Sequence, residues 1–325
     1  MYLFEEKEIK KYVSINQEFI QLMEEGFTKL ANNEVALPPI MRIDIPEYNG
    51  EVDVKSAYIK GKDSFAIKIS SGFFDNHLLG LPSLGGLMML FSSKTGFPEA
   101  ILLDNGYLTD VRTAAAGAVA ANYLAKSSVD CVGVIGTGMQ ARVQMEALYK
   151  VRPFQRITVY GRTQERTEKY VRDMEKSIGV KVVQAASAEE VVKESEIVVT
   201  TTPSTEALIK GEWLHRGLHI TAMGSDAEHK RELASNCFQK ADVICCDVKK
   251  QAFRLGELHH TVRDGTILKE DERILELGEI TSKRKLGRIN DQQITICDLT
   301  GTGVQDTICA RYAFDLLKQA EISIR

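Results

Sequence analysis

The sequence predicts an α/β protein in which a doubly wound parallel sheet is joined to a smaller α+β domain. The first observation is the alternation, from residue 130 to about 299, of short apolar runs and helical patterns, which is the order of a parallel sheet. The second is the glycine turn 136–138, which follows one apolar run directly and leads into a helix. The third is that residues 1–107 lack this alternation and contain one helix followed by several β-like segments.

In the smaller domain, the first helix is expected to begin at a capping box formed by Ser14 and Gln17. Its apolar residues recur at helical spacing and mark the buried face: Phe19, Ile20, Met23, Phe27 and Leu30. Strands are expected at four runs bounded by turn residues, 53–58, 64–70, 86–92 and 99–104. An alanine-rich helix over 108–125, with Thr109 as its N-cap, leads into the parallel sheet.

The parallel sheet is expected to have strands near seven positions: Cys131, Ile157, Val182, Ile197, His219, Val243 and Thr295. A second capping box, Ser187 with Glu190, predicts the helix before the strand at 197–201. A turn at 301–303 precedes a terminal helix over about 306–320, which is expected to return to the first domain. The predicted domains are therefore residues 1–125 with 304–325, and residues 126–303.

The turn at 136–138 has the composition of a dinucleotide-binding turn at the start of a Rossmann domain. Gly136 permits the tight turn, Gly138 lets backbone amides approach a pyrophosphate, and Ala141 lets the helix pack against the strand. The phosphates would then lie at the helix N-terminus. A strand before the turn and an apolar-faced helix after it favour this interpretation over an ordinary strand-to-helix turn.

The residues after the second strand bear on the choice of cofactor. An NAD-specific site usually places an acidic residue there to hold the ribose 2′-hydroxyl, whereas this chain has Gly161, Arg162 and Thr163. Arg162, with Arg166, could accept a 2′-phosphate, so the sequence favours NADP(H) over NAD(H). The alternative is that Arg162 is a solvated loop residue.

Ligands of open α/β sheets bind beyond the carboxyl ends of the strands, and two further strand ends carry suitable groups. Thr201 follows the fourth strand, near the position expected for the nicotinamide ribose. Asp226 follows the fifth strand, and a carboxylate there could act as a general acid or base. The competing interpretation is that Asp226 caps a following helix.

The first domain carries cations at positions that solvated lysines seldom occupy. Alternation along 64–70 places Lys68 in mid-strand among small neighbours. Arg112 lies in the first turn of the helix over 108–125, where the helix dipole favours an anion. Together with Arg42, these residues predict a site for a substrate carboxylate.

Composition restricts the class of partner. The 41 Lys and Arg residues are balanced by 45 Asp and Glu residues, so a formal charge of −4 gives no electrostatic basis for binding nucleic acid or an anionic membrane. The six cysteines lack CxxC spacing, and no export signal or membrane-length apolar run is recognised, which predicts a cytoplasmic protein. No metal site is expected, because no third ligand at a recognisable spacing accompanies His215 with His219, or Glu257 with His259 and His260.

Taken in order, these motifs resemble those of the ornithine cyclodeaminase and μ-crystallin family. The resemblance rests on Arg42, AIK at 66–68, LTDVRTAAAGA at 108–118, GVIGTGMQA at 133–141 and MGSDAEHKREL at 223–233. It implies a homodimer whose first domain binds substrate and forms the subunit interface, beside a Rossmann domain that binds NAD or NADP.

The resemblance also implies the roles of individual residues. Arg42, Lys68 and Arg112 would bind the substrate carboxylate, and Asp226 would be the catalytic carboxylate. The residues that it places around the cofactor are Gly136, Gly138, Met139, Gln140, Thr201, Met223, Lys230, Gly301 and Gly303.

Two departures from the family pattern shape the expected reaction. Members that act on ornithine with tightly held NAD have an acidic residue near position 161, where this chain has Gly161 and Arg162. The stretch 254–265 looks more like the branch linked to ectoine utilisation and iminosuccinate reduction. The sequence therefore favours an NAD(P)(H)-dependent reductase or dehydrogenase of small α-imino or α-amino acids. In it Asp226 would handle the proton, while Lys68 would hold the carboxylate and polarise the imine.

Two other functions stay open. In a redox-neutral cyclodeaminase, hydride leaves the α-carbon, ammonia departs as the ring closes, and hydride returns. Asp53 could bind the distal ammonium of such a diamine, whereas Lys55, two residues on and on the same strand face, could bind a distal carboxylate. The third possibility is a nucleotide-binding protein without turnover, like the crystallin branch, and the retention of Asp226 argues against it.

Overall fold

The computed structural model describes residues 1–324, which form two compact units. The first unit consists of Met1–Ile15, Lys29–Arg112 and the chain from Thr302 onward, and the second consists of Asn16–Thr28 and Thr113–Gly301. Residues 16–28 and 113–125, which the sequence assigns to the first domain, therefore pack within the second unit. Among the described residues, no helix is both long enough and apolar enough to cross a membrane.

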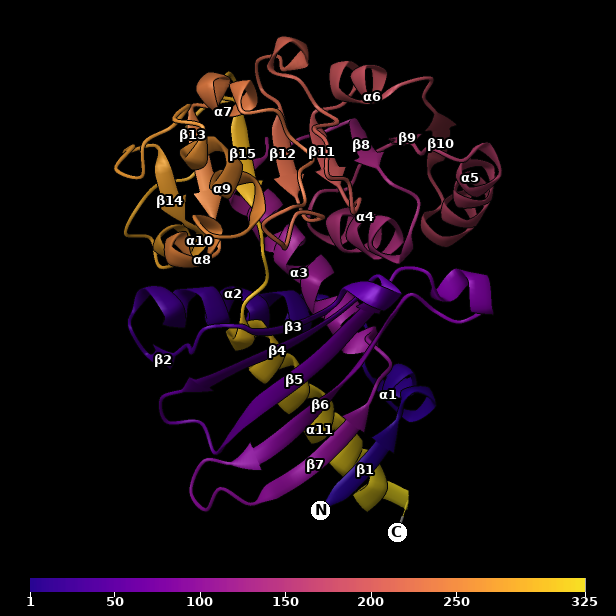
Figure 1. The fold of residues 1–325 in the computed structure, drawn as a ribbon, viewed down its shortest axis with the longest axis vertical. Helices are drawn as coiled ribbons and strands as arrows, with labels where there is room; N and C mark the ends of the chain where they lie inside the picture. The colour runs from indigo at the N-terminus through magenta and orange to yellow at the C-terminus, as the bar shows by residue number, and fades with distance from the viewer. Residues whose placement is uncertain (325) are drawn as a thin grey trace. The chain divides into compact units, whose positions relative to one another are not determined.

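The first unit is built on a mostly antiparallel sheet with the strand order β1-β7-β6-β5-β4-β2, in which β3 also pairs with β4 (Figure 1). The predicted strands correspond to the four long strands β4 to β7. The strands are β1 (Tyr2–Glu5), β2 (Val35–Ala36), β3 (Met41–Ile45), β4 (Gly50–Ile59), β5 (Ser64–Phe73), β6 (Leu84–Ser92) and β7 (Pro98–Leu103). The other elements of this unit are α1 (Glu6–Tyr12), α11 (Gly303–Ile324) and the 3-10 helices η1 (Pro46–Tyr48) and η2 (Asn76–Leu79).

Helix α11 lies along one face of this sheet and begins three residues before the predicted start (Figure 1). Its first residue must be glycine, because a Cβ at Gly303 would lie 2.2 Å from the Ser56 carbonyl oxygen. Further along, Thr307 Oγ1 donates to the Ala57 carbonyl at 2.7 Å, and Val304 packs against Ala57 and Ile59. These contacts fix the start of α11 against the middle of β4.

The second unit contains an eight-stranded sheet in the order β10-β9-β8-β11-β12-β15-β13-β14, and every pairing in it is parallel. The doubly wound fold predicted from the sequence is confirmed. Its strands are β8 (Cys131–Ile135), β9 (Arg156–Tyr160), β10 (Lys181–Gln184), β11 (Ile197–Thr200), β12 (His219–Ala222), β13 (Val243–Cys246), β14 (Ile274–Glu276) and β15 (Thr295–Asp298). The order reverses between β8 and β11, which is the switch point where such sheets bind ligands.

Helices cover both faces of the parallel sheet. The helices from α2 to α10 are α2 (Gln17–Ala31), α3 (Tyr107–Leu124), α4 (Met139–Val151), α5 (Gln164–Ile178), α6 (Ala188–Glu194), α7 (Asn236–Lys240), α8 (Lys249–Ala252), α9 (Gly256–Arg263) and α10 (Leu277–Thr281), with a 3-10 helix η3 (Gly211–Trp213). The division of the chain into two units falls within α2, after Thr28, and within α3, after Arg112.

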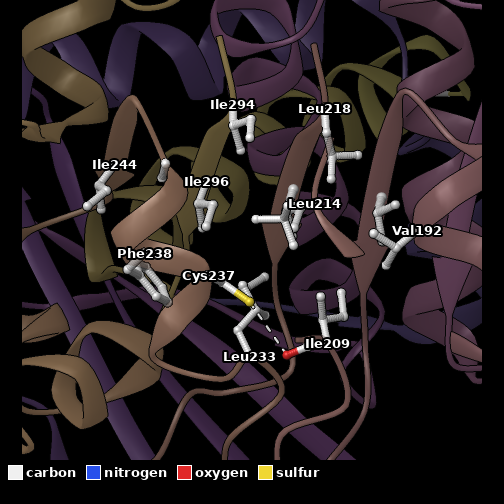
Figure 2. Packing of buried hydrophobic residues seen from close by; sticks show 14 of the residues in the cluster. Val192, Ile209, Leu214, Leu218, Leu233, Cys237, Phe238, Ile244, Ile294 and Ile296 are labelled. Atoms are coloured by element: carbon white, nitrogen blue, oxygen red, sulfur yellow. Dashed lines mark hydrogen bonds between the residues drawn. The ribbon is translucent and has the colours of Figure 1, made fainter. Parts of the chain in front are cut away.

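The parallel sheet lies between two separate apolar cores, and alternate residues of its central strands contribute to them. In β11, Val198 belongs to one cluster, whereas Ile197 and Val199 belong to the cluster on the opposite face. Figure 2 shows the first cluster, where Ile244 and Ile296 lie near Phe238. Burial on both faces explains why these strands read as continuous apolar runs.

Two predicted helix caps, Ser14 and Thr109, are wrong, and each error has a local cause. Helix α2 begins at Gln17, and Asn16 Oδ1 accepts a hydrogen bond from Phe19 N–H at 2.8 Å, so Asn16 makes the cap in place of Ser14. Helix α3 begins at Tyr107, which puts the predicted cap Thr109 inside the helix. The predicted cap of α6 is confirmed, because Ser187 Oγ accepts from Glu190 N–H.

Candidate functional site

The turn between β8 and α4 has the geometry that its glycines predict. Gly136 has φ of +118°, and a Cβ there would lie 2.4 Å from Thr201 Oγ1, so no other residue fits without rearrangement. Gly138 is the N-cap of α4, and a Cβ there would meet nothing within 4 Å. Met139, the first residue of the helix, is 57% exposed. The helix N-terminus is therefore open to an anionic group, which fits the pyrophosphate of a dinucleotide.

The other predicted cofactor residues of the second unit lie around the same strand ends. Gln140 is in the first turn of α4 and accepts a hydrogen bond from Gln144. Thr201 follows β11, and Met223 follows β12, where its N–H donates to the Thr200 carbonyl. Both strands neighbour each other in the sheet, and β11 also pairs with β8.

Arg162 and Thr163 are exposed after β9, and Thr163 precedes α5 as its N-cap residue without a capping side-chain hydrogen bond. Gly161 is packed tightly: a Cβ there would lie 2.6 Å from Thr137 Cγ2 and 2.8 Å from Thr167 Oγ1. Because an acidic side chain has no room at position 161, the ribose contact usual in NAD-specific sites is not available from this residue.

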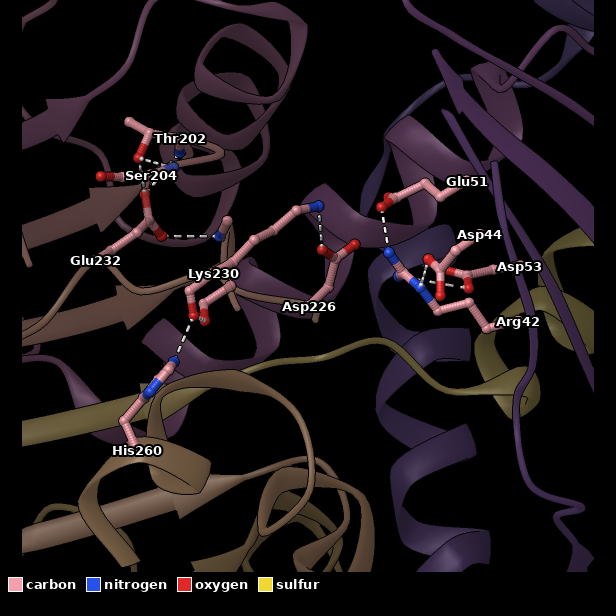
Figure 3. A network of polar contacts seen from close by, with 12 residues as sticks. Arg42, Asp44, Glu51, Asp53, Thr202, Ser204, Asp226, Lys230, Glu232 and His260 are labelled. Atoms are coloured by element: carbon pink, nitrogen blue, oxygen red, sulfur yellow. Dashed lines mark hydrogen bonds and ion pairs between the residues drawn. The ribbon is translucent and has the colours of Figure 1, made fainter. Parts of the chain in front are cut away.

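Glu232 joins the ends of β11 and β12, and sequence reasoning did not find it. Its Oε1 accepts from Thr202 N–H at 2.6 Å and from Thr202 Oγ1 at 2.8 Å, and its Oε2 accepts from Thr200 Oγ1 at 2.6 Å and from Gly224 N–H at 2.9 Å (Figure 3). Burial raises the pKa of Glu232, although these hydrogen bonds oppose the rise. The fully buried side chain thereby fixes the loop that leads to Asp226.

Asp226 is paired with Lys230 in that loop. Lys230 Nζ donates to Asp226 Oδ1 at 2.7 Å, and the Lys230 side chain is 8% exposed while that of Asp226 is 39% exposed (Figure 3). His260 Nε2 donates to the Lys230 carbonyl at 2.8 Å, and Ser225 Oγ donates to it at 2.6 Å. No helix follows Asp226 directly, since the next one, α7, begins at Asn236, so the interpretation of Asp226 as a helix cap is wrong.

The turn after β15 is also fixed by a buried carboxylate. Asp247 Oδ2 accepts from Thr300 N–H at 2.9 Å and from Gly301 N–H at 2.7 Å. Gly301 has φ of +79°, in the left-handed region that favours glycine. Gly303, the other glycine of this predicted cofactor turn, belongs to the first unit.

In the first unit, Lys68 and Arg112 share one carboxylate. Asp306 Oδ1 lies 3.3 Å from Lys68 Nζ and 3.0 Å from Arg112 Nε. All three residues are buried, with 2%, 4% and 0% of their surface exposed for Lys68, Arg112 and Asp306. Sequence reasoning placed Asp306 only at the start of the terminal helix and missed its role as an ion-pair partner.

Lys55 lies directly opposite Lys68 in the pairing of β4 with β5, and it is also buried. Two ammonium groups at facing positions of an antiparallel pair repel each other. Burial lowers the pKa of Lys68 to about 7, an effect that Arg112 and Lys55 strengthen and Asp306 opposes. A region where two buried cations share one carboxylate is suited to an incoming carboxylate.

Arg42 is held by acidic residues of β3 and β4. Its guanidinium pairs with Asp44 at 2.8 Å, with Glu51, and with Asp53 at 3.7 Å (Figure 3). Although burial lowers the pKa of Arg42, these three carboxylates raise it above its ordinary value. Strand pairing places Arg42 opposite Asp53 on β4. Asp53 lies two residues from Lys55 on the same face of β4. The Arg42–Asp53 pair and the Lys55–Lys68 pair therefore form neighbouring rows across the sheet.

The chain matches the model of the ornithine cyclodeaminase/mu-crystallin family over residues 2–321. The chain belongs to this family. It is 48% identical over 314 residues, covering 97% of this chain and 95% of the relative, to a protein of Rhizobium meliloti that is provisionally named a dehydrogenase. It is also 47% identical over 315 residues, with the same coverage, to an uncharacterised cyclodeaminase of Sinorhizobium fredii. The resemblance recognised from the motifs is thereby confirmed.

Three solved structures of family enzymes share the fold over nearly their whole length. The Δ1-pyrroline-2-carboxylate reductase of Thermococcus litoralis, in complex with NADH and L-proline, gives a TM-score of 0.94 at 29% identity, covering 99% of this chain and 98% of that chain. An archaeal alanine dehydrogenase dimer with bound NAD gives 0.91 at 31%, covering 99% and 97%. The iminosuccinate reductase of Paracoccus denitrificans with NAD⁺ gives 0.90 at 26%, covering 99% and 98%.

Proposed function

We propose that this protein is an NAD(P)(H)-dependent oxidoreductase that acts on a small α-imino or α-amino acid, as an imine reductase or an amino-acid dehydrogenase. The observation that carries the proposal is the buried pair of cations Lys68 and Arg112, which share the single carboxylate of Asp306. The open N-terminus of α4 after the Gly136 turn supports a nucleotide ligand. Three relatives that bind NADH or NAD and whose names describe imine reduction or amino-acid dehydrogenation add further support.

In this proposal, Lys68 and Arg112 bind the substrate carboxylate, with Arg42 in the neighbouring row, and Lys68 also polarises the imine. The nicotinamide, when bound, supplies or accepts the hydride at the α-carbon. Asp226 transfers the proton to or from the substrate nitrogen or water, and Lys230 orients the Asp226 carboxylate through their ion pair. The residues proposed to hold the dinucleotide are Gly136, Gly138, Met139, Gln140, Arg162, Thr163, Thr201, Met223, Lys230, Gly301 and Gly303.

The preference between NADP(H) and NAD(H) is proposed to depend on Arg162. Its exposed side chain follows β9, where it can reach a 2′-phosphate, and Gly161 leaves no room for an acidic side chain. These features favour NADP(H), whereas the three solved relatives named above are complexes with NADH or NAD. Both cofactors must therefore be compared directly.

A redox-neutral cyclodeaminase is the second candidate, and one observation favours it. Three carboxylates, those of Asp44, Glu51 and Asp53, pair with the single guanidinium of Arg42. A cluster of carboxylates suits the distal ammonium of a diamino acid, while the ammonium of Lys55 suits a distal carboxylate. The third candidate function is that of a nucleotide-binding protein without turnover, as in the crystallin branch.

The deciding experiment is the absorbance at 340 nm of NADH or NADPH mixed with the purified protein and a panel of substrates. The panel contains cyclic imines, 2-oxo acids with ammonia, and oxaloacetate with ammonia. We expect one reduced cofactor to be consumed, which would identify both the substrate class and the cofactor. Ammonia release from ornithine with catalytic NAD, without net change at 340 nm, would instead establish the cyclodeaminase. Binding of either cofactor without any turnover would support the third candidate.

We also propose that the protein is a homodimer that buries the sheet face opposite α11. That face carries apolar side chains that remain partly exposed: Val52, Val54, Ile67, Ile69, Leu87 and Met89. A second copy is the occupant we expect, because the archaeal alanine dehydrogenase with the same fold is a dimer. Light scattering on the purified protein should give twice the mass of the chain, and replacing Ile69 with Lys should give the monomer. A monomeric wild-type protein would contradict the proposal.

The cytoplasm remains the proposed location. All six cysteines are buried and free of disulfides, as expected for a protein of a reducing compartment.

A further inference from the structure

The carboxylate of Asp306 lies at the centre of a buried group of charges in the first unit. Its Oδ1 is within ion-pair distance of both Lys68 Nζ and Arg112 Nε, and the side chain has no exposed surface. Burial alone would raise the pKa of Asp306, but Arg112 and Lys68 lower it below its ordinary value. An aspartate in this position stays charged because the cations on either side of it are charged.

The simplest alternative is that Asp306 only stabilises the start of α11. The side chain does lie in the first turns of that helix, where the helix dipole favours an anion. However, within residues 1–324 neither of its carboxylate oxygens accepts a hydrogen bond of good geometry, from a backbone N–H of α11 or from any other donor. The carboxylate is therefore placed to interact with the two cations and does not cap the helix.

The charges that face Lys68 come from every element around it. They are Lys55 on β4, Arg112 on α3, Asp104 before α3, and Asp306 and Cys309 on α11. Burial raises the pKa of Asp104 to about 6 and raises that of the Cys309 thiol well above its ordinary value, so the thiol is neutral. Lys55 and Lys68 oppose each other directly, and Lys68 and Arg112 share the one carboxylate of Asp306.

We propose that Asp306 is a positioning residue of the substrate site, a fixed counter-ion that keeps the Lys68 ammonium and the Arg112 guanidinium charged and oriented for the substrate carboxylate. The proposal rests on the proposed function, because it takes the ligand of these cations to be the carboxylate of an imino or amino acid. Without Asp306, Lys68 and Arg112 would lose the carboxylate that they share, and Lys68 would give up its proton more readily. The site would then bind a carboxylate weakly at a pH where it now binds it well.

The test is the pair of variants Asp306→Asn and Asp315→Asn, with KM and kcat measured from about pH 6 to about pH 9. Asp315 lies on the same helix, is partly exposed and pairs with Arg311, so its variant controls for the loss of one carboxylate from α11. In Asp306→Asn we expect KM at pH 8 to rise roughly tenfold or more, with a smaller change in kcat. We also expect the pH above which KM rises to shift lower by about one unit, whereas Asp315→Asn should match the wild type. An unshifted pH profile in Asp306→Asn would overturn the proposal.

Two further measurements cover the other outcomes. If Asp306→Asn does not fold, the double variant Lys68→Met with Asp306→Asn should restore folding, because it removes a cation together with the anion. No restoration would show that Asp306 acts in packing alone and would overturn the proposal. If the wild type turns over none of the substrates, the proposed function fails. Acetate binding, measured by thermal shift, then tests the counter-ion role. Weaker binding in Asp306→Asn than in the wild type supports the proposal. Equal binding in the two proteins, or no binding to the wild type, overturns the proposal.

Discussion

Replacing Asp226 with Asn is expected to lower kcat by a factor of about 10² to 10⁴ while leaving cofactor affinity close to that of the wild type. The amide keeps the shape of the side chain and can still accept the hydrogen bond from Lys230 Nζ. It cannot take up a proton, so the step that moves a proton to or from the substrate is lost. The measurements are turnover at 340 nm and the NADH or NADPH dissociation constant from fluorescence titration.

The matched control is Glu228→Gln, which removes an exposed carboxylate from the same loop. It should retain wild-type kcat, because Glu228 lies on the surface and its loss changes the net charge by the same amount. If Asp226→Asn kept full activity, the role of Asp226 as the proton-transfer group would be wrong. If both variants lost activity equally, the loss would reflect the loop and not the carboxylate.

The parts of the fold that could be predicted from sequence are those that depend on local pattern. Most of the seven predicted parallel strands are short apolar runs buried on both faces, as Val198 and its neighbours Ile197 and Val199 show for β11, and this pattern is what the sequence reveals. The short strand β14 was missed, because three residues give too little pattern. Helix starts were predicted less well, since Asn16 and Ser14 are both good caps and only the backbone decides between them.

The candidate site could be predicted where one residue carries its own signal. Lys68 was found because a lysine in mid-strand among small residues is unusual, and the structure buries it. Asp306 gave no such signal, because an aspartate in the first turn of a helix is common. Its role depends on α11 packing against β5, a contact between distant parts of the chain. Glu232 was missed for the same reason, since its hydrogen bonds reach back to Thr200 and Thr202.

Arg42 shows a different limit. The sequence grouped it with Lys68 and Arg112 because all three are cations in the first domain. Strand pairing instead places Arg42 opposite Asp53, and the guanidinium is paired with acidic neighbours. A substrate carboxylate that binds Arg42 must compete with those acidic side chains, whereas a substrate ammonium can bind to them. The choice between a dicarboxylic and a diamino substrate therefore depends on the charges of the Arg42–Asp53 and Lys55–Lys68 pairs together. No single residue in the sequence predicts that choice.

Replacing Gly136 with Ala is expected to weaken cofactor binding by about 100-fold or more, because the change acts on the turn itself. The residue has φ of +118°, and the new Cβ would lie 2.4 Å from Thr201 Oγ1, so the backbone must move to admit it. Displacement of this turn would also displace the Gly138 backbone from its place at the start of α4. The dissociation constants for NADH and NADPH, measured by fluorescence titration, test this expectation.

The control is Gly179→Ala, which adds a methyl group at another glycine with positive φ, +81°, where a Cβ meets nothing within 4 Å. It should lower the free energy of unfolding by roughly 1 kcal/mol and leave cofactor affinity unchanged, because Gly179 ends α5. The contrast separates the strain of positive φ, which both variants share, from the collision with Thr201, which is particular to Gly136. Wild-type affinity in Gly136→Ala would show that the dinucleotide does not depend on this turn. Equal weakening in both variants would mean that lost stability, and not the altered turn, reduces binding.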